Sequence, residues 1–171
     1  MKQSKKIQVE MVADRGYEIP DEEQHILYED DPEIDDYNTI YQGPNVLGVY
    51  FMVDKSLKEF REMMEDCDEG ILIYSEVYDK IVKKQKFKQP IQFFFIEELQ
   101  SNITKNVFNG TYTIVTNPFN VHDLPVLYLN DPIVKYYNYS AGTVLKVVEE
   151  NDLDTLNPYN IIFCIVKNAT F

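Results

Sequence analysis

The sequence predicts an α+β protein with two domains, an α/β domain at residues 1–102 followed by a smaller, mixed α/β domain at residues 103–171. Three apolar runs of the first domain alternate with helical patterns, and they lie at 46–53, 70–74 and 90–96. This order is typical of a small parallel sheet flanked by helices. Beyond residue 102 the apolar runs are mostly strand-like, and turn signals separate them. A chain of 171 residues with 44% hydrophobic residues can bury one core or two small ones.

The helices of the first domain are predicted from apolar spacing and from one start signal. Apolar residues in a charged opening predict an amphipathic helix over 7–15. Ser56 and Glu59 form a capping-box pattern, which predicts a helix that continues to about Cys67. Residues 77–86 are predicted to form another helix, with a basic outer face.

The densest charge feature is an acidic segment at residues 18–36. It contains ten acidic residues, and no Lys or Arg occurs between Arg15 and Lys55. We expect residues 18–36 to form a solvated, partly disordered connector that self-repulsion keeps extended, within an acidic, irregular stretch at 18–45. The alternative is that residues 18–36 present an acidic face that docks on a basic partner.

The second domain is organised around residues 124–148, an extended segment followed by a helix, a turn and a strand. Asp131 predicts the helix start, because its carboxylate can accept bonds from the free amides of the first turn, and Pro132 suits the first helical position. The helix should end before Gly142 and lead into a strand at 143–148.

Two further predictions complete the second domain. Asn109-Gly110 is a strong turn pair, so residues 107–108 and 112–115 are expected to pair as a hairpin. The last strand is predicted over 161–166.

Composition limits the possible classes of function. The net charge of −13 argues against a protein that wraps nucleic acid on its own. No signal peptide is visible, and no apolar window is long enough to cross a membrane. The two cysteines suit a reducing compartment, and their spacing allows a disulfide without requiring one.

No pattern for catalysis, cofactor binding or a metal site occurs. Glycine-rich phosphate loops are absent, and the cysteines and histidines are isolated in sequence: His25, Cys67, His122 and Cys164. A divergent metal-dependent nuclease remains an alternative for a small α/β domain. Such enzymes place an acidic residue two positions before a lysine, and no lysine of this chain has one. Four carboxylates could still hold a metal ion weakly: Asp54, Asp66, Asp68 and Glu76.

Three ordered landmarks resemble one family, the fifth subunit of eukaryotic RNA polymerases, which has an archaeal relative that corresponds to its carboxy-terminal part. The residues at 124–148 resemble its carboxy-terminal assembly domain, with the same order of Leu-Pro, strand, Asp-Pro, short Tyr-rich helix, Gly and Val-x-Lys-Val-Val. The corner Asp14-Arg15-Gly16-Tyr17 is similar to the end of the family's first helix. A strand at 91–99 followed by Asn102-Ile103-Thr104 is similar to its domain junction.

The resemblance implies a fold and a role. It implies an amino-terminal jaw domain of restriction-endonuclease-like topology without its active site, followed by the assembly domain. The expected function is that of a non-catalytic subunit of a DNA-dependent RNA polymerase in transcription, with no cofactor or small-molecule substrate. Its partners would be the largest subunit and other polymerase subunits, with downstream DNA approached weakly or indirectly.

The partner-binding residues are implied by the assembly motif: Leu124, Pro125, Asp131, Pro132, Tyr136, Tyr137, Gly142, Val144 and Lys146. Tyr136 and Tyr137 are the leading interface candidates because aromatic residues dominate interface energetics, although both could instead be core residues. The resemblance names no residue that approaches DNA.

Departures from the family pattern suggest a partner surface that has diverged. The family carries arginines where this chain has Val126, Ala141 and Glu149, and its His-Glu-Leu-Val-Pro-Lys-His run is replaced at residues 105–110. Residues 116–123 are too few for a helix that family members carry there. Asn, Ile and Tyr make up 42 of the 171 residues, a bias that favours a large DNA virus over a cellular source. The expected location is the nucleus for a cellular protein, and the virion or a viral factory for a viral one.

Overall fold

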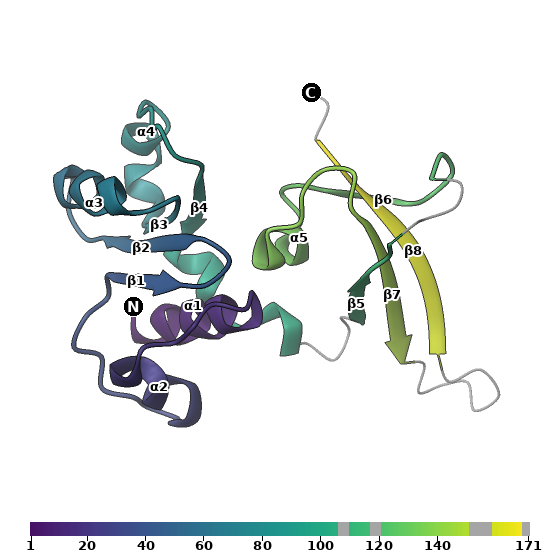
Figure 1. Ribbon diagram of the computed structural model, residues 1–171, viewed down its shortest axis with the longest axis horizontal. Coiled ribbons are helices and arrows are strands. Elements are labelled where there is room, and N and C mark those ends of the chain that lie inside the picture. Colours follow the sequence, from purple (N-terminus) through teal and green to yellow (C-terminus); the bar gives the residue numbers. More distant parts are fainter. Residues whose placement is uncertain (106–109, 117–120, 151–158, 169–171) are drawn as a thin grey trace. The chain divides into compact units, whose positions relative to one another are not determined.

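The chain forms two compact units, an amino-terminal unit (Met1–Ser101) and a carboxy-terminal unit (Asn102–Phe171) (Figure 1). The computed structural model describes residues 1–105, 110–116, 121–150 and 159–168. Each unit contains a four-stranded mixed sheet accompanied by helices. The predicted mixed α/β character is therefore confirmed.

The sheet of the amino-terminal unit has the strand order β1-β2-β3-β4. The strands are β1 (Thr39–Gln42), β2 (Val46–Met52), β3 (Glu69–Tyr74) and β4 (Ile91–Phe95). β2, β3 and β4 are parallel to one another, as the alternation of apolar runs and helical patterns predicts. β1 adds an antiparallel edge beside β2, and the sequence did not predict it.

Both faces of the central strands are buried, which explains their continuous apolar sequences. One face packs against the side chains of Phe60, Met64 and Val82. The helical elements of this unit are α1 (Lys2–Asp14), α2 (Asp21–Tyr28), α3 (Lys58–Met63), η1 (Met64–Asp66), η2 (Glu76–Tyr78), α4 (Asp79–Val82) and η3 (Ile96–Leu99).

The acidic segment is folded, so the prediction of an irregular connector at 18–45 is wrong for α2 and β1. Glu23 of α2 is buried, and its carboxylate lies 2.7 Å from the Lys5 ammonium, which is fully buried in α1. The hydroxyl groups of Thr39 and Tyr41 in β1 donate to the same carboxylate. Ile26 adds an apolar anchor on the same helix. One interior ion pair therefore overrides the self-repulsion of the surface acids.

Two predicted helices are shorter than expected. The helix after β2 begins at Lys58 with Leu57 as its N-cap, and the predicted capping box does not form. Ser56 Oγ accepts a bond from the Lys58 amide at 3.3 Å, but the Glu59 carboxylate instead accepts from the Tyr50 hydroxyl at 3.0 Å. The helix predicted over 77–86 ends at Val82, and a non-helical lysine-rich segment follows it.

The carboxy-terminal unit has the strand order β5-β7-β8-β6. Its elements are η4 (Ile103–Lys105), β5 (Thr111–Ile114), β6 (Val126–Tyr128), α5 (Pro132–Tyr137), β7 (Val144–Glu150) and β8 (Tyr159–Lys167). β7 pairs antiparallel with β5 and β8, and β6 runs parallel to β8. The predicted Asn109-Gly110 turn lies outside the described residues.

Candidate partner-binding surface of the carboxy-terminal unit

Helix α5 starts as the sequence predicts. Asp131 is its N-cap, and Asp131 Oδ1 accepts a hydrogen bond from the Ile133 amide at 3.0 Å. Pro132 occupies the first turn, where its lack of an amide hydrogen costs nothing. The Asp-Pro pair therefore fixes the residue at which α5 begins, and with it the side chains that face the sheet.

Two residues with positive φ end the helix and turn the chain into β7. Asn138 adopts the left-handed conformation with φ 55°, and the Tyr139 amide closes the helix end by donating to the Val134 carbonyl at 3.0 Å. Gly142 has φ 92°, a conformation that favours glycine, and its amide donates to the Val166 carbonyl at 2.8 Å. The glycine therefore ties the turn to β8.

Strand register separates the two faces of this sheet. The helix face packs Val134 of α5 against Leu145 of β7 and Val166 of β8. Directly paired residues project from the same side of a sheet, and side chains alternate along each strand. Lys146 pairs with Phe163, one position along from Leu145, so both lie on the opposite face. We call this second face the open face.

The open face exposes a group of large apolar side chains. Val126, Tyr128, Tyr159, Ile161 and Phe163 are 36–58% exposed, and register places all five on it. Lys146 lies beside Phe163 on this face and is half-buried, and its side chain forms no hydrogen bond or ion pair with the described residues. Register also places Lys167 there, exposed and paired with Tyr128, together with the buried Val144 and Ile165. Exposed apolar side chains beside a few cations are typical of a protein-binding surface.

The nine residues of the predicted motif have different roles in the structure. Tyr136 and Val144 are buried, and Tyr136 is only 3% exposed. Its hydroxyl accepts a hydrogen bond from Asn102 Nδ2 at 3.2 Å. Tyr137 is half-buried and stacks on Tyr139 with ring centroids 5.3 Å apart. The remaining members lie as follows: Pro125, Pro132 and Gly142 are exposed, while Leu124, Asp131 and Lys146 are half-buried.

The residues that sequence reasoning missed are the exposed apolar ones of β6 and β8. The run at 161–166 is apolar at odd and even positions alike, which predicts a strand buried on both faces. The structure buries Cys164 and Val166 on the helix face but leaves Ile161 and Phe163 exposed. Tyr128, Ile161 and Phe163 occupy alternating positions of neighbouring strands, a signal that only the register reveals.

The cysteines and the acidic side chains were the remaining candidates for chemistry. Burial raises the pKa of the thiols of Cys67 and Cys164, and both cysteines are free. Within the described part of the chain, no group of three or more His, Cys, Asp or Glu side chains could hold a metal ion. None of the described helices is long and apolar enough to cross a membrane.

Comparison with known proteins gives one informative relative. A protein of Arabidopsis thaliana named "DNA-directed RNA polymerases IV and V subunit 5B" is 24% identical to this chain over 178 aligned residues. The alignment covers 85% of this chain and 81% of the relative. No family model matches. The predicted resemblance to the fifth-subunit family is confirmed.

Two of the sequence landmarks shared with the fifth-subunit family, the corner at 14–17 and Asn102-Ile103-Thr104, have clear structural roles. In the corner at 14–17, Gly16 has φ 85° and ends α1, and the Tyr17 amide donates to the Val12 carbonyl at 3.2 Å. Asn102 Oδ1 accepts from the Thr104 amide at 2.9 Å and from the Thr104 hydroxyl at 2.7 Å. The same Asn102 side chain binds Tyr136, so the Asn-Ile-Thr and Tyr-rich landmarks hold each other in place.

Proposed function

We propose that this protein is a non-catalytic subunit of a multisubunit DNA-dependent RNA polymerase and acts in transcription. The observation that carries the proposal is its similarity, over 85% of its length, to a relative named as a polymerase subunit. The carboxy-terminal unit serves as the assembly domain that docks on the largest subunit. The amino-terminal unit serves as a restriction-endonuclease-like jaw without an active site and lies near downstream DNA.

The open face is the docking surface of this proposal. Ile161 and Phe163 supply apolar contacts on β8, Val126 and Tyr128 supply them on β6, and Lys146 supplies a charge on β7, beside Phe163. Desolvated apolar and aromatic side chains contribute most of the free energy of such interfaces.

The other motif residues support this surface rather than contact the partner. Asp131, Pro132 and Gly142 set the ends of α5 and its turn, while Tyr136 and Val144 are buried. The exposed Pro125 directly precedes Val126 of the surface, whereas the half-buried Tyr137 belongs to α5 on the helix face and stacks on Tyr139.

Affinity capture from the native source tests the proposal. The wild-type chain should recover the two largest polymerase subunits, and Phe163→Asp should abolish their recovery because it places a charge in the apolar patch. Val77→Asp is the matched control, since Val77 is 77% exposed in the other unit. Recovery of a monomeric wild-type chain, or equal loss by both variants, would overturn the proposed docking.

A free-standing acidic adaptor is a second candidate, and the folded acidic segment favours it. Because α2 is anchored, its exposed carboxylates form a fixed surface. Deleting residues 18–36 would remove buried Glu23 and Ile26, so the sharper change neutralises the exposed Asp21 and Glu22 of α2 as amides. An adaptor would then lose its basic partner, whereas a subunit docked through the open face would still assemble.

The net charge of −13 sets an expectation for DNA. The isolated chain should bind duplex DNA only weakly, and binding should fall steeply with salt. Sub-micromolar binding at physiological salt would contradict this part of the proposal. A cellular protein of this function would act in the nucleus, and a viral one in the virion or a viral factory.

A further inference from the structure

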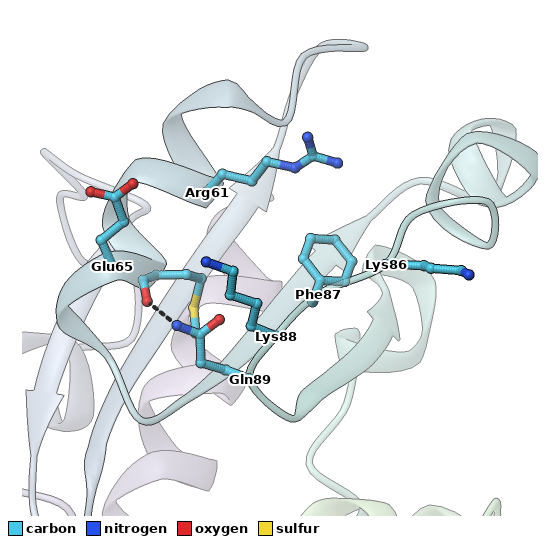
Figure 2. Close-up of a pocket in the computed structure, with 7 residues that line it drawn as sticks. Arg61, Glu65, Lys86, Phe87, Lys88 and Gln89 are labelled. Carbon is cyan, nitrogen blue, oxygen red and sulfur yellow. Dashed lines mark hydrogen bonds between the residues drawn. The ribbon is translucent and has the colours of Figure 1, made fainter.

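A hollow of about 500 Å³ lies on the amino-terminal unit, between the α3–η1 region and the segment that follows α4. Its lining residues are Arg61, Met64, Glu65, Lys86, Phe87, Lys88 and Gln89. Glu65 lies at one end and Lys86 at the other, with the side chains of Arg61, Phe87 and Lys88 between them (Figure 2).

A second hollow of about 340 Å³ continues the first along α3. It shares Arg61 and Glu65 with the first hollow and adds Lys55, Leu57, Lys58, Glu62, Ile81 and Gln85 to the lining. The Arg61 guanidinium donates a hydrogen bond to Gln85 Oε1 between the two. We call the two adjoining hollows the α3 groove.

The α3 groove is cationic on a strongly acidic protein. Five cations and two carboxylates line it, a net charge of +3, whereas the whole chain carries −13. Lys58 pairs with Glu62 at 3.6 Å on the rim. Among the described residues, Lys86 and Lys88 have no ion-pair partner, and both are exposed. Their charges are therefore available to an external anion.

The floor of the groove is apolar and held in place. The Phe87 ring contacts Phe60 with centroids 5.5 Å apart and Phe93 with centroids 6.2 Å apart. Gln89 Nε2 donates to the Met64 carbonyl at 2.7 Å, which ties the lysine-rich segment to η1 (Figure 2). A fixed floor lowers the ordering cost of binding.

We propose that the α3 groove binds an acidic peptide segment of a partner protein, with an apolar side chain of that segment resting on Phe87. Carboxylates of the peptide would pair with Arg61 and Lys88, and Glu65 would limit the charge density at the far end. Duplex DNA fits less well. Its phosphate backbone would be repelled by the carboxylates of the lining and would make no use of the apolar floor. This inference goes beyond the polymerase assignment and does not depend on it.

Fluorescence anisotropy with the full chain tests the proposal. The probe is a short fluorescein-labelled peptide of Asp and Glu with a central Phe-Leu pair, beside the same peptide with Ala-Ala and a short labelled DNA duplex. Arg61→Glu/Lys88→Glu should weaken binding of the Phe-Leu peptide by at least about tenfold, since each charge-assisted contact is worth about that factor. Lys80→Glu/Lys84→Glu is the matched control, because it makes the same change of charge at exposed lysines outside the lining.

The outcomes separate the possibilities. Loss of binding in the groove variant alone, with weaker binding of the Ala-Ala peptide, supports the proposal. Equal loss in both variants would show that the peptide responds to the overall charge of the protein and not to the groove. Tighter binding of the duplex would show a nucleic-acid site. Either result, or no binding of the Phe-Leu peptide at all, overturns the proposal. Thermal melting checks the fold, and Lys86→Gln/Lys88→Gln replaces the charge reversal if that variant does not fold.

Discussion

The amino-terminal unit buries five polar side chains, whereas the described part of the carboxy-terminal unit buries none. In the first unit Lys5, Gln8 and Glu23 join α1, α2 and β1 through one network. In the second unit the helix face depends on three fully apolar side chains, and the open face exposes five large apolar or aromatic ones. The comparison indicates that the first unit joins its helices and sheet edge through buried polar contacts, while the second gathers exposed apolar side chains on one face of its sheet, where a partner can cover them.

The largest expected difference between the two units is in their stability at high pH. Tyr17, Tyr41, Tyr50 and Tyr74 of the amino-terminal unit each donate to a carboxylate. Burial first, and then the carboxylate, raises the pKa of each; that of Tyr50 rises to about 12 from the usual 10.0.

A raised tyrosine pKa stabilises the fold fully below pH 10, and this stability is lost as pH rises through the folded value. Lys5 has the opposite effect on stability, because burial lowers its pKa. Its contribution therefore rises with pH, but only until the pH reaches its ordinary pKa of 10.5. Burial also raises the pKa of Tyr112 and Tyr139 in the carboxy-terminal unit, so the difference depends on the larger number of such tyrosines in the amino-terminal unit. We therefore expect the amino-terminal unit to unfold first above pH 10, as followed by residue-resolved NMR. Loss of the carboxy-terminal signals first would contradict the comparison.

Lys5→Met should have the next largest effect. It leaves the Glu23 carboxylate buried without its cation, and breaking a buried pair costs about 4 kcal/mol of the free energy of unfolding. Urea unfolding with hydrogen exchange should show the loss in the amino-terminal unit. Lys5→Met/Glu23→Gln should recover at least half of it, because the amide oxygen still accepts from Thr39 or Tyr41. A double variant as unstable as the single one would argue against the ion pair as the cause.

Leu145→Ala tests the apolar core of the carboxy-terminal unit. Leu145 is fully buried, and its truncation should cost about 3 kcal/mol through lost burial and a cavity. Ile114→Ala is the control on the same face, since Ile114 is largely exposed at the end of β5. Similar losses from both changes, measured by hydrogen exchange of β7 and β8, would show that the core extends further than Val134, Leu145 and Val166.

Asp131→Ala should have the smallest effect, about 1 kcal/mol, because it removes one N-cap hydrogen bond from α5. Asp131→Asn should retain most of the stability, and Asp123→Ala should leave it unchanged because Asp123 is exposed. Chemical denaturation of the three variants gives the ranking. An Asn variant as unstable as the Ala variant would point to the charge rather than the cap.

Local signals were enough to predict several elements. The start of α5 could be predicted from two adjacent residues, Asp131 and Pro132. β2, β3 and β4 could be predicted from their apolar runs, which are typical of parallel strands. Segment 18–45 was misjudged because its order depends on Lys5, which precedes it in the chain and gives no local sign of being buried.

The binding surfaces were harder to predict because they join residues from separate segments. The open face requires the register between β6, β7 and β8, which fixes the side on which Phe163 lies. The α3 groove requires Arg61 and Lys88 to meet across different elements. The capping box failed because Tyr50, on a neighbouring strand, offers Glu59 a different partner.

The buried pair of Lys5 and Glu23 also affects how fast a partner can be found. Because it holds α2 in place, the exposed acids of that region keep a fixed pattern, and their field acts over about 8–10 Å in physiological salt. A basic partner would be steered toward this pattern before contact, and little chain ordering would remain to be done in the encounter complex. The interior lysine therefore fixes the charge pattern of a surface that it never touches.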